Sequence, residues 1–257
     1  MARSTYYYHT SRRGNDKYAD IRKRIGEIFS LHGMRYGYRR VHQQLSNEGH
    51  SINHKTVQRL MQEMNLRSRV RRVKYRSYRG DIGRIAPNIL DRKFEAAMPN
   101  HKWATDVTEF KVADSKAYLS PIIDMFNGEI ISYTISDRPD LKMVMDMMHS
   151  AKRKVRNTEG IILHSDQGWH YQHSRYQQTL KDYGITQSMS RKGNCLDNAV
   201  MENFFGIMKS ELLYLQKFSD MDDFKRQLKK YIHYYNNDRI KLKLKGKSPV
   251  QYRTLYT

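Results

Sequence analysis

The sequence predicts an α/β protein in which a small all-α domain precedes a larger domain built on a mixed sheet. Apolar residues recur at helical spacing between residues 21 and 64, in three consecutive short segments. From Lys102 the pattern changes to β-rich runs joined by short turns, and strands then alternate with helices as far as Ser190. A chain of 257 residues with 39% hydrophobic residues is long enough to bury both cores.

The first domain is predicted to consist of three helices, with Gly33 and Gly37 in the first gap, Gly49 in the second and Asn53 as the N-cap of the third. The apolar positions are Ile21, Ile25, Ile28 and Phe29, then Tyr38, Val41 and Leu45, and then Val57, Leu60, Met61 and Met64. This arrangement predicts a helix-turn-helix, although the six residues between the second and third helices exceed the usual connection of about three or four.

The third helix leaves a polar face that is formed by Lys55, Gln58, Arg59 and Gln62. Side chains of these types hydrogen bond to base edges in the major groove of DNA. We therefore predict that these four residues contact DNA. The alternative is a small helical bundle with a polar outer face, because charge alone does not make a recognition helix.

A basic segment, LRSRVRRVKYRSYRG, follows the three helices and contains no acidic residue. Its basic residues are Arg67, Arg69, Arg71, Arg72, Lys74, Arg76 and Arg79, with Tyr75 and Tyr78 between them. We predict an arm that lies along DNA phosphates through Arg69, Arg71, Arg72 and Lys74; a solvated linker is the alternative. The predicted domains are therefore 1–66 for the helix-turn-helix, 67–98 for the linker or arm, and 99–257 for the second domain.

The second domain is predicted to open with an antiparallel meander of the runs WATDVTEFKV, AYLSPIIDMF and EIISYTIS, with turns at 114–116 and 127–128. The elements that follow are the helix LKMVMDMMHSAKRKVRN, the strand GIILHSD, the helix SRYQQTLKDYG and the strand ITQSMS. Two further helices are DNAVMENFFGIMKSE and MDDFKRQLKKYIHYYNN, the latter capped by Ser219 or Asp220. These elements predict a mixed sheet with helices.

The helix at 197–211 has one unusual face. Asn198, Glu202, Gly206 and Lys209 lie roughly in line beside an apolar stripe of Met201, Phe204, Phe205, Met208 and Leu212. A glycine inside a helix costs about 1 kcal/mol relative to alanine, so its presence one turn after an acid suggests that something needs room there. The alternative is a solvated flank with a tolerated glycine.

The charge of the chain indicates a polyanionic partner. Lys and Arg total 47 against 26 Asp and Glu, a formal charge of +21, of which residues 1–84 carry +14. Nucleic acid is the leading partner, although a basic ribosomal or membrane-surface protein shows similar totals. No apolar run of about 18 residues or secretory signal is present, so the expected compartment is the cytoplasm. Cys195 is the only cysteine, which excludes an intrachain disulfide and zinc sites built on cysteine pairs.

Three acids stand out as candidate metal ligands. Asp106 falls in an otherwise apolar strand, on the face of Ala104 and Thr108, and Asp166 ends the run IILHSD before a glycine turn. Either of them alone has an ordinary explanation, as a strand-edge acid or a turn cap. With Glu202 they form a set of hard oxygen donors that suits Mg²⁺ or Mn²⁺. Two such ions about 3.5 to 4 Å apart promote phosphodiester displacement.

The motifs around these acids resemble those of the DDE transposases of bacterial insertion sequences, in the group whose catalytic subunit, OrfB, has a retroviral-integrase-like core. The motifs are WATDVTEF, LHSDQGWHYQ and KGNCLDNAVMENFFGIMKSELLY. Thirty-five residues separate Asp166 from Glu202, and Lys209 lies seven residues beyond Glu202; both spacings match the family. The ending YIHYYNNDRIKLKLKGKSPVQYR and the segment 17–75 also resemble the family, so the resemblance covers nearly the whole chain.

The resemblance implies an RNase H-like fold with Asp106 on the first strand, Asp166 after the fourth and Glu202 on a following helix, all three as catalytic ligands of two Mg²⁺ ions. It implies that Asn198 and Gly206 leave clearance and that Lys209 contacts DNA. His164 and His170 flank Asp166 as candidate contacts to DNA or metal. The implied reaction frees a 3′ hydroxyl at an element end, and that hydroxyl then attacks another phosphodiester.

The resemblance also implies partners and a location. We expect DNA as substrate, a homo-oligomer that is at least a dimer on DNA, an upstream OrfA-type subunit or fusion, and no membrane, in the bacterial cytoplasm near the nucleoid. The start MARSTYYYHT resembles the middle of a familiar segment, so we expect residues upstream of it. Unlike retroviral integrases, the chain carries no zinc-binding domain of His and Cys residues. Two rival functions remain, an RNase H-like hydrolytic nuclease and a non-catalytic DNA-binding regulator.

Overall fold

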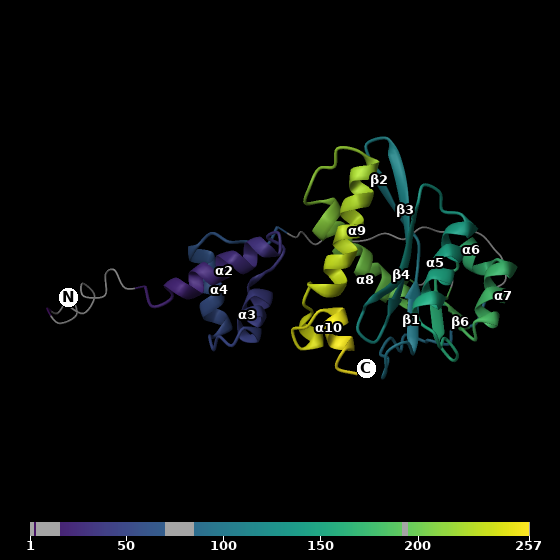
Figure 1. The fold of residues 1–257 in the computed structure, drawn as a ribbon, viewed down its shortest axis with the longest axis horizontal. Helices are drawn as coiled ribbons and strands as arrows, with labels where there is room; N and C mark the ends of the chain where they lie inside the picture. The colour runs from purple at the N-terminus through teal and green to yellow at the C-terminus, as the bar shows by residue number, and fades with distance from the viewer. Residues whose placement is uncertain (1–2, 4–15, 70–84, 192–194, 257) are drawn as a thin grey trace. The chain divides into compact units, whose positions relative to one another are not determined.

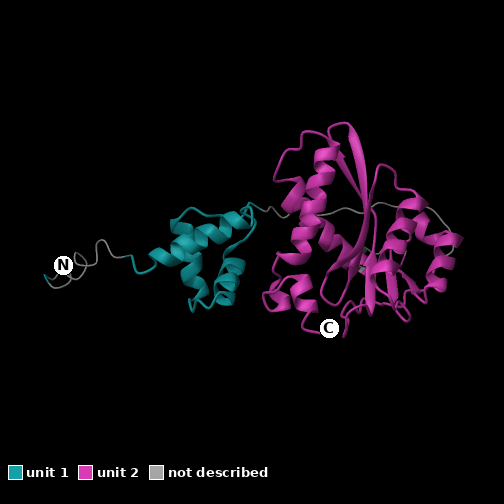
Figure 2. Ribbon diagram, viewed as in Figure 1, with its two compact units in different colours: residues 1–69 teal, residues 70–257 magenta. Residues whose placement is uncertain are grey.

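The structure is a computed structural model that describes residue 3 and residues 16–69, 85–191 and 195–256 (Figure 1). The chain divides into two compact units, residues 1–69 and residues 70–257 (Figure 2). None of the described helices is long and apolar enough to cross a membrane.

The first unit contains the three predicted helices, α2 (Ala19–Leu31), α3 (Tyr38–Asn47) and α4 (His54–Glu63). Their buried residues are Ile25, Ile28, Phe29, Val41, Leu45, Val57, Leu60 and Met61, which belong to the predicted apolar stripes. The side chain of Asn53 accepts a hydrogen bond from the backbone N–H of Lys55 at 2.8 Å, which confirms the predicted N-cap. The six-residue connection between α3 and α4 is also as predicted.

The second unit is built on the predicted mixed sheet. Its strands are β1 (Lys102–Thr105), β2 (Thr108–Val112), β3 (Ser115–Asp124), β4 (Ile130–Ser136), β5 (Ile162–Ser165) and β6 (Thr186–Met189). β3 pairs antiparallel with β1, β2 and β4, which confirms the meander. β5 runs parallel to β1, and β6 parallel to β5. The carboxyl ends of β1, β5 and β6 therefore meet at one edge of the sheet.

One predicted strand is interrupted at its acid. The run WATDVTEFKV forms β1 and β2, with Asp106 and Val107 between them outside the ladder, so the expectation that Asp106 lies inside a strand is wrong. Thr105 pairs with Ile122 and Thr108 pairs with Leu119, a register that leaves Asp106 opposite Pro121. Proline has no backbone N–H to donate to the ladder, which explains the interruption at this point.

Helices cover both faces of the sheet (Figure 1). On one face α5 (Leu141–Lys154), α6 (Trp169–Gln172) and α7 (Ser174–Asp182) enclose a core that includes Trp103, Met147, Leu163, Tyr171 and Tyr176. On the other face α8 (Ala199–Met208), a π-helix (Lys209–Leu213) and α9 (Met221–Asn237) enclose Ala104, Phe110 and the stripe of Met201, Phe204, Phe205, Met208 and Leu212. The apolar stripe predicted for this helix is therefore confirmed. Asp220 caps α9 by accepting from Asp223 N–H at 2.7 Å.

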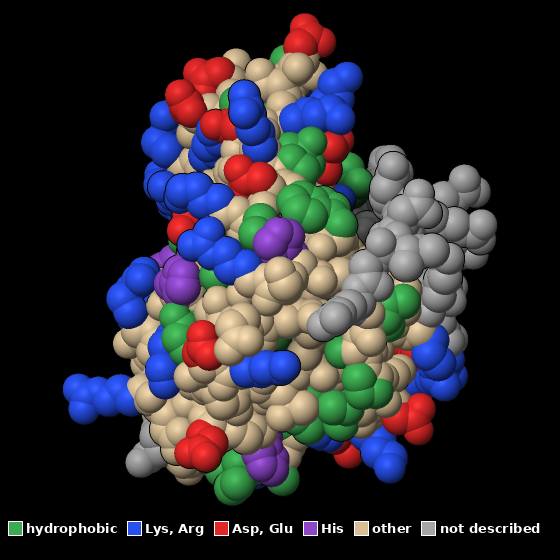
Figure 3. Space-filling view, turned by 90° about the vertical axis from the view of Figure 1, so that its right-hand side faces the viewer, with side chains coloured by type: hydrophobic (Ala, Val, Ile, Leu, Met, Phe, Trp, Pro, Cys, Tyr) green, Lys and Arg blue, Asp and Glu red, His purple; other side chains and the backbone are tan. Residues whose placement is uncertain are grey.

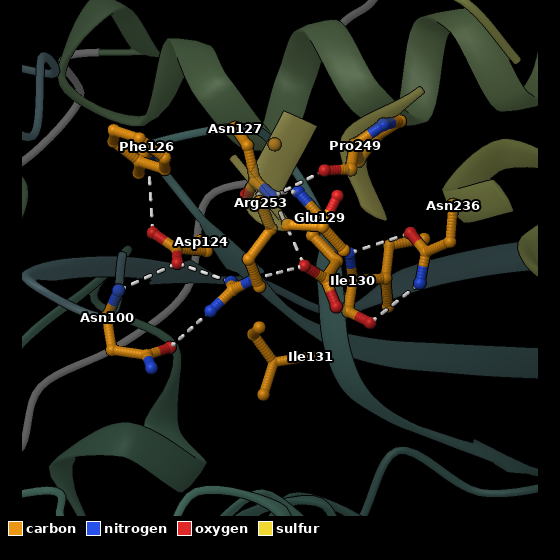
Figure 4. A network of polar contacts seen from close by, with 12 residues as sticks. Asn100, Asp124, Phe126, Asn127, Glu129, Ile130, Ile131, Asn236, Pro249 and Arg253 are labelled. Atoms are coloured by element: carbon orange, nitrogen blue, oxygen red, sulfur yellow. Dashed lines mark hydrogen bonds and ion pairs between the residues drawn. The ribbon is translucent and has the colours of Figure 1, made fainter. Parts of the chain in front are cut away.

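The C-terminal helices are tied to the sheet by polar contacts. Arg253 of α10 (Pro249–Arg253) donates to the carboxylate of Asp124 at 2.6 Å and to Glu129, while Asn236 of α9 exchanges two hydrogen bonds with the backbone of Ile130, both at 2.9 Å (Figure 4). Burial raises the pKa of Asp124, and the Arg253 guanidinium opposes that rise. The last two helices thus hold the β3–β4 turn in place.

Candidate active site

Asp106 occupies the break between β1 and β2, where its side chain is partly exposed. Its Oδ1 accepts a hydrogen bond from Val107 N–H at 2.7 Å, and its Oδ2 accepts one from the Asn198 amide at 3.1 Å. Burial raises the pKa of Asp106 well above its usual value, and the charges of Asp166 and Glu202 raise it further while Lys209 lowers it. The charges of the two other predicted acids and of the predicted lysine therefore all act on Asp106.

Asp166 follows β5, the strand beside β1, and its position comes from the parallel pairing of the two strands. Ala104 pairs with His164, so the residues two positions further along both strands, Asp106 and Asp166, leave the sheet at the same edge. The Asp166 carboxylate accepts from Gly168 N–H at 2.8 Å, and burial raises its pKa. A Cβ on Gly168 would stand 3.0 Å from Oδ1 of Asp166, so a side chain there would require the carboxylate to shift.

Glu202 lies on α8 and Lys209 at the start of the π-helix, two elements that pack on one face of the sheet. Both side chains are partly exposed; burial raises the pKa of Glu202 and lowers that of Lys209. The Lys209 ammonium lies 5.5 Å from the centre of the Phe110 ring. A Cβ on Gly206, between them, would meet no described atom within 4 Å. This surface of α8 is open, in agreement with the clearance expected at Gly206.

Asn198 has a different position from the one expected. It was predicted to leave clearance, but it is buried in the 3-10 turn Cys195–Asn198 and hydrogen bonds to Asp106. Its Oδ1 has no hydrogen-bond partner among the described residues. Asn198 therefore directly supports one of the acids. The sequence signal was its place on the Glu202 face of the helix, but spacing alone did not reveal which residue it contacts.

His164 and His170, the candidate contacts beside Asp166, are both buried. His164 shares a hydrogen bond of 2.9 Å between its Nδ1 and the Ser188 hydroxyl, and burial lowers its pKa. His170 packs edge to face against Trp169 and Tyr171, and burial lowers its pKa to about 4. Both rings are therefore neutral at pH 7.

The acids have the chemistry of a divalent-cation site, although their side chains are not gathered into one. Among the described residues, no three His, Cys, Asp or Glu side chains are arranged to hold a metal ion. The donors at hand are carboxylate oxygens, which Mg²⁺ and Mn²⁺ prefer. Asp106 accepts hydrogen bonds from Val107 N–H and the Asn198 amide, and the negative charges of Asp166 and Glu202 act on it, an unfavourable state that a shared cation would relieve. The residues therefore fit such an ion.

The predicted DNA contacts of the first unit are mostly accessible. Lys55, Arg59 and Gln62 are exposed on α4, whereas Gln58 is partly buried, and Arg59 forms an ion pair with Glu63 at 3.2 Å. Arg69 is exposed, while Arg71, Arg72 and Lys74 lie outside the described residues. On the face of the second unit that Figure 3 shows, Lys and Arg side chains lie among acidic ones and do not form a single basic patch.

Family comparisons match most of the chain. The HTH-like domain matches residues 17–74, and two models named Integrase core domain match residues 96–195 and 202–255. The match at 17–74 agrees with the predicted helix-turn-helix, and the matches at 96–195 and 202–255 contain the three acids.

Individual relatives match about four fifths or more of the sequence, as the following two show. The InsK protein of Escherichia coli strain K12, assigned as a transposase of insertion sequence element IS150, is 55% identical over 98% of this chain and 90% of its own length. A transposase-like protein of Haemophilus influenzae is 52% identical over 79% of this chain and 94% of its own. The solved intasome of simian T-cell lymphotropic virus shares the fold, with a TM-score of 0.52 and 18% identity over 89% of this chain and 74% of that chain.

Proposed function

We propose a reaction for this chain, which belongs to the transposases of bacterial insertion sequences with an integrase core. It cleaves one DNA strand at an element end and joins the freed 3′ hydroxyl to another phosphodiester. The family matches confirm the resemblance seen in the sequence. The observation that supports the proposal is that Asp106 and Asp166 leave adjacent parallel strands at the same edge, while Glu202 on α8 is close enough for its charge to raise the pKa of Asp106.

The three carboxylates are the groups that would hold divalent metal, two Mg²⁺ ions with Mn²⁺ as a substitute. When bound, such ions activate the attacking oxygen and stabilise the leaving oxygen. The chain's own contribution is to hold the acids. Val107 N–H and the Asn198 amide fix the orientation of the Asp106 carboxylate, and Gly168 N–H fixes that of Asp166. Oriented ligands of this kind reduce the motion that has to be lost when metal and DNA bind.

Lys209 is proposed to bind a phosphate of the DNA end. Its ammonium acts electrostatically on Asp106 and Glu109, and its partial burial lowers its pKa, so a phosphate beside it would stabilise the charged form. The open surface at Gly206 gives the DNA backbone room to approach α8 between Glu202 and Lys209. These features agree with a strand end held against the acids.

The first unit is proposed to bind the element ends. The exposed face of α4 supplies Lys55, Arg59 and Gln62, with Gln58 beside them, and the basic arm supplies Arg69, Arg71, Arg72 and Lys74. Because joining an element requires both of its ends, we propose that the protein acts on DNA as a homo-oligomer, at least a dimer, with an OrfA-type subunit as a further partner. We place this activity in the bacterial cytoplasm, at the nucleoid.

A joining assay tests the proposal. Labelled element ends are incubated with Mg²⁺, a target plasmid and the wild-type chain, Asp106→Asn or Glu202→Gln, with Asp182→Asn as an exposed-acid control on α7. We expect joined products from the wild type and the control, and none from the two site variants, with DNA affinity retained by all four. Cut but unjoined ends would favour a hydrolytic nuclease, and equal joining by Asp106→Asn would refute the assignment.

A further inference from the structure

Asp197, the residue before Asn198, has a carboxylate that is completely buried yet surrounded by donors. Its side chain is 0% exposed. The donors are Asn88 Nδ2 at 3.0 Å, Arg92 Nε at 2.9 Å, and Arg191 N, Nε and Nη2 at 3.1, 2.9 and 3.2 Å. The Arg191 guanidinium, followed by that of Arg92, holds the pKa of Asp197 well below its usual range. The Asp197 carboxylate is therefore held in its charged form by two guanidinium groups.

Two of these donors come from a segment that no matched domain includes. Asn88 and Arg92 lie between the end of the HTH-like match at residue 74 and the start of the integrase core match at residue 96. The same segment is bound to β6, where the Ser188 hydroxyl accepts from the backbone N–H groups of Ile89 and Leu90 at 3.0 and 3.2 Å. The segment is thus an integral part of the second unit.

The backbone of this segment is strained at the residue that contacts Asp197. Asp91 and Arg92 both have positive φ, 40° and 61°, a conformation that residues with a side chain rarely adopt, least of all in succession. The turn is held by the Asn88 side chain, which accepts from Asp91 N–H at 2.9 Å, and by the bond from Arg92 to Asp197. A strained turn of this kind persists only where the surrounding contacts maintain it.

Asp197 and Asn198 connect this turn to the acids. The carboxylate of Asp197 is fixed by Arg92 on one side, and the amide of the next residue donates to Asp106 on the other. Both belong to the 3-10 turn that leads directly into α8, whose first turn carries Glu202. The position of Asp197 therefore influences two of the three acids at once.

We propose that residues 88–92 are a positioning element of the active centre, which fixes Asp197 so that Asn198 and Glu202 are correctly placed around the divalent-cation site. This inference rests on the proposed function of the three acids. It assigns a role to Asn88 and Arg92, which lie outside every matched domain and touch none of the acids themselves.

A purely structural role is the competing explanation, because removing one partner of a buried carboxylate destabilises any fold. Arg92→Gly separates the two roles. It removes the guanidinium, but it also relieves the strain at φ 61°, since glycine adopts positive φ freely. We therefore expect this variant to lose the contact to Asp197 with a smaller loss of stability than Arg92→Ala.

The test is Mn²⁺ binding to the full chain without DNA, measured by calorimetry, with the melting temperature recorded for each variant. We expect roughly 10-fold weaker Mn²⁺ binding for Arg92→Gly, Arg92→Ala and Asn88→Ala, the lower end of the range for residues that orient metal ligands. Arg92→Lys, which keeps one donor, should recover part of the affinity. Arg138→Ala, an exposed arginine in the loop between β4 and α5, is the matched control and should bind as the wild type does.

Wild-type Mn²⁺ affinity in folded Arg92→Gly would overturn the inference, whatever its melting temperature. If the proposed function is wrong, the result is different: Asp106→Asn binds Mn²⁺ with the same affinity as the wild type. Weak binding by Arg92→Gly together with loss of binding in Asp106→Asn supports both.

Discussion

The amide of Asn198 donates to Oδ2 of Asp106 at 3.1 Å, across 92 residues of sequence. This bond joins the start of α8 to the end of β1. It orients the Asp106 carboxylate from the helix that carries Glu202. We predict that Asn198→Ala slows strand joining roughly 10- to 100-fold, the usual effect of losing a residue that orients a metal ligand. Joining rates at increasing Mg²⁺ measure this, and partial recovery at high Mg²⁺ is expected. An unchanged Mg²⁺ dependence would contradict the orienting role.

Asp106 is predicted to destabilise the metal-free protein at neutral pH. Because its pKa is raised, the folded state binds a proton at Asp106 more tightly than the unfolded state does. The free energy of unfolding therefore decreases as the pH rises from the unfolded pKa to the folded pKa. Asp106→Asn should therefore raise the melting temperature of metal-free protein at pH 7 to 8. The Asn198 amide can rotate so that its Oδ1, which has no partner among the described residues, accepts from the new amide.

With added Mg²⁺, the wild type should instead melt at a higher temperature than Asp106→Asn. A ligand at about 100 times its Kd stabilises the folded state by about 2.7 kcal/mol, and only the wild type binds it well. Thermal melts with and without Mg²⁺ provide the comparison. A variant that melts below the wild type in the absence of metal would show that the acids do not repel one another.

His170 is predicted to make the protein sensitive to acid. Its folded pKa of about 4 lies below its unfolded value of 6.5, so stability falls as pH decreases from about 6.5 to about 4 and no further below that. The full effect is at most about 3.4 kcal/mol, at 1.36 kcal/mol for each pKa unit. Urea unfolding of the wild type and His170→Gln at several pH values checks this. Parallel pH profiles for the two proteins would contradict it.

The buried ion pair between Glu211 and Arg239 is predicted to be needed as a pair. The guanidinium donates to both carboxylate oxygens, at 2.8 and 2.7 Å, and Tyr231 adds a third bond at 3.0 Å. Glu211→Ala leaves a buried cation and should cost about 3 to 5 kcal/mol, whereas Glu211→Met with Arg239→Met should be far less harmful. Chemical unfolding of the wild type and these two variants measures the difference. A double variant as unstable as the single one would indicate that the pair itself supplies stability.

Lys55 on α4 is predicted to contribute to sequence-specific binding and Arg69 to general affinity. Lys55→Ala should weaken binding to element ends by about 1 to 3 kcal/mol and leave binding to unrelated DNA nearly unchanged. Arg69→Ala should weaken both and reduce the log-log salt slope by about 0.9. Lys23→Ala, an exposed lysine on α2, is the control. Equal losses on both DNAs for Lys55→Ala would place that residue on phosphate.

Local patterns in the sequence were sufficient for most elements. The helical periods of the first unit, the caps Asn53 and Asp220, and the meander follow from neighbouring residues, and each is confirmed. The short helix α10 was missed, although Ser248 before a proline, with Gln251 three residues later, is the pattern of a capping box. The interruption at Asp106 was missed because its cause, Pro121, lies on a different strand.

The surroundings of the acids could not be predicted in the same way. The bonds from Asn88 and Arg92 to Asp197 span 109 and 105 residues, and the π-helix at Lys209–Leu213 breaks the regular helical period. Such contacts depend on how distant segments pack, which periodicity does not record. Spacing and the family resemblance selected the three acids as candidates, and the fold shows which residues contact them.

The most direct measurement of the central claim is anomalous diffraction from crystals of the protein with an element-end DNA and Mn²⁺. The account predicts Mn²⁺ peaks bounded by carboxylate oxygens of Asp106, Asp166 and Glu202, with a DNA phosphate oxygen completing the shell. Well-ordered DNA with the three carboxylates pointing apart, and Mn²⁺ bound elsewhere, would contradict it.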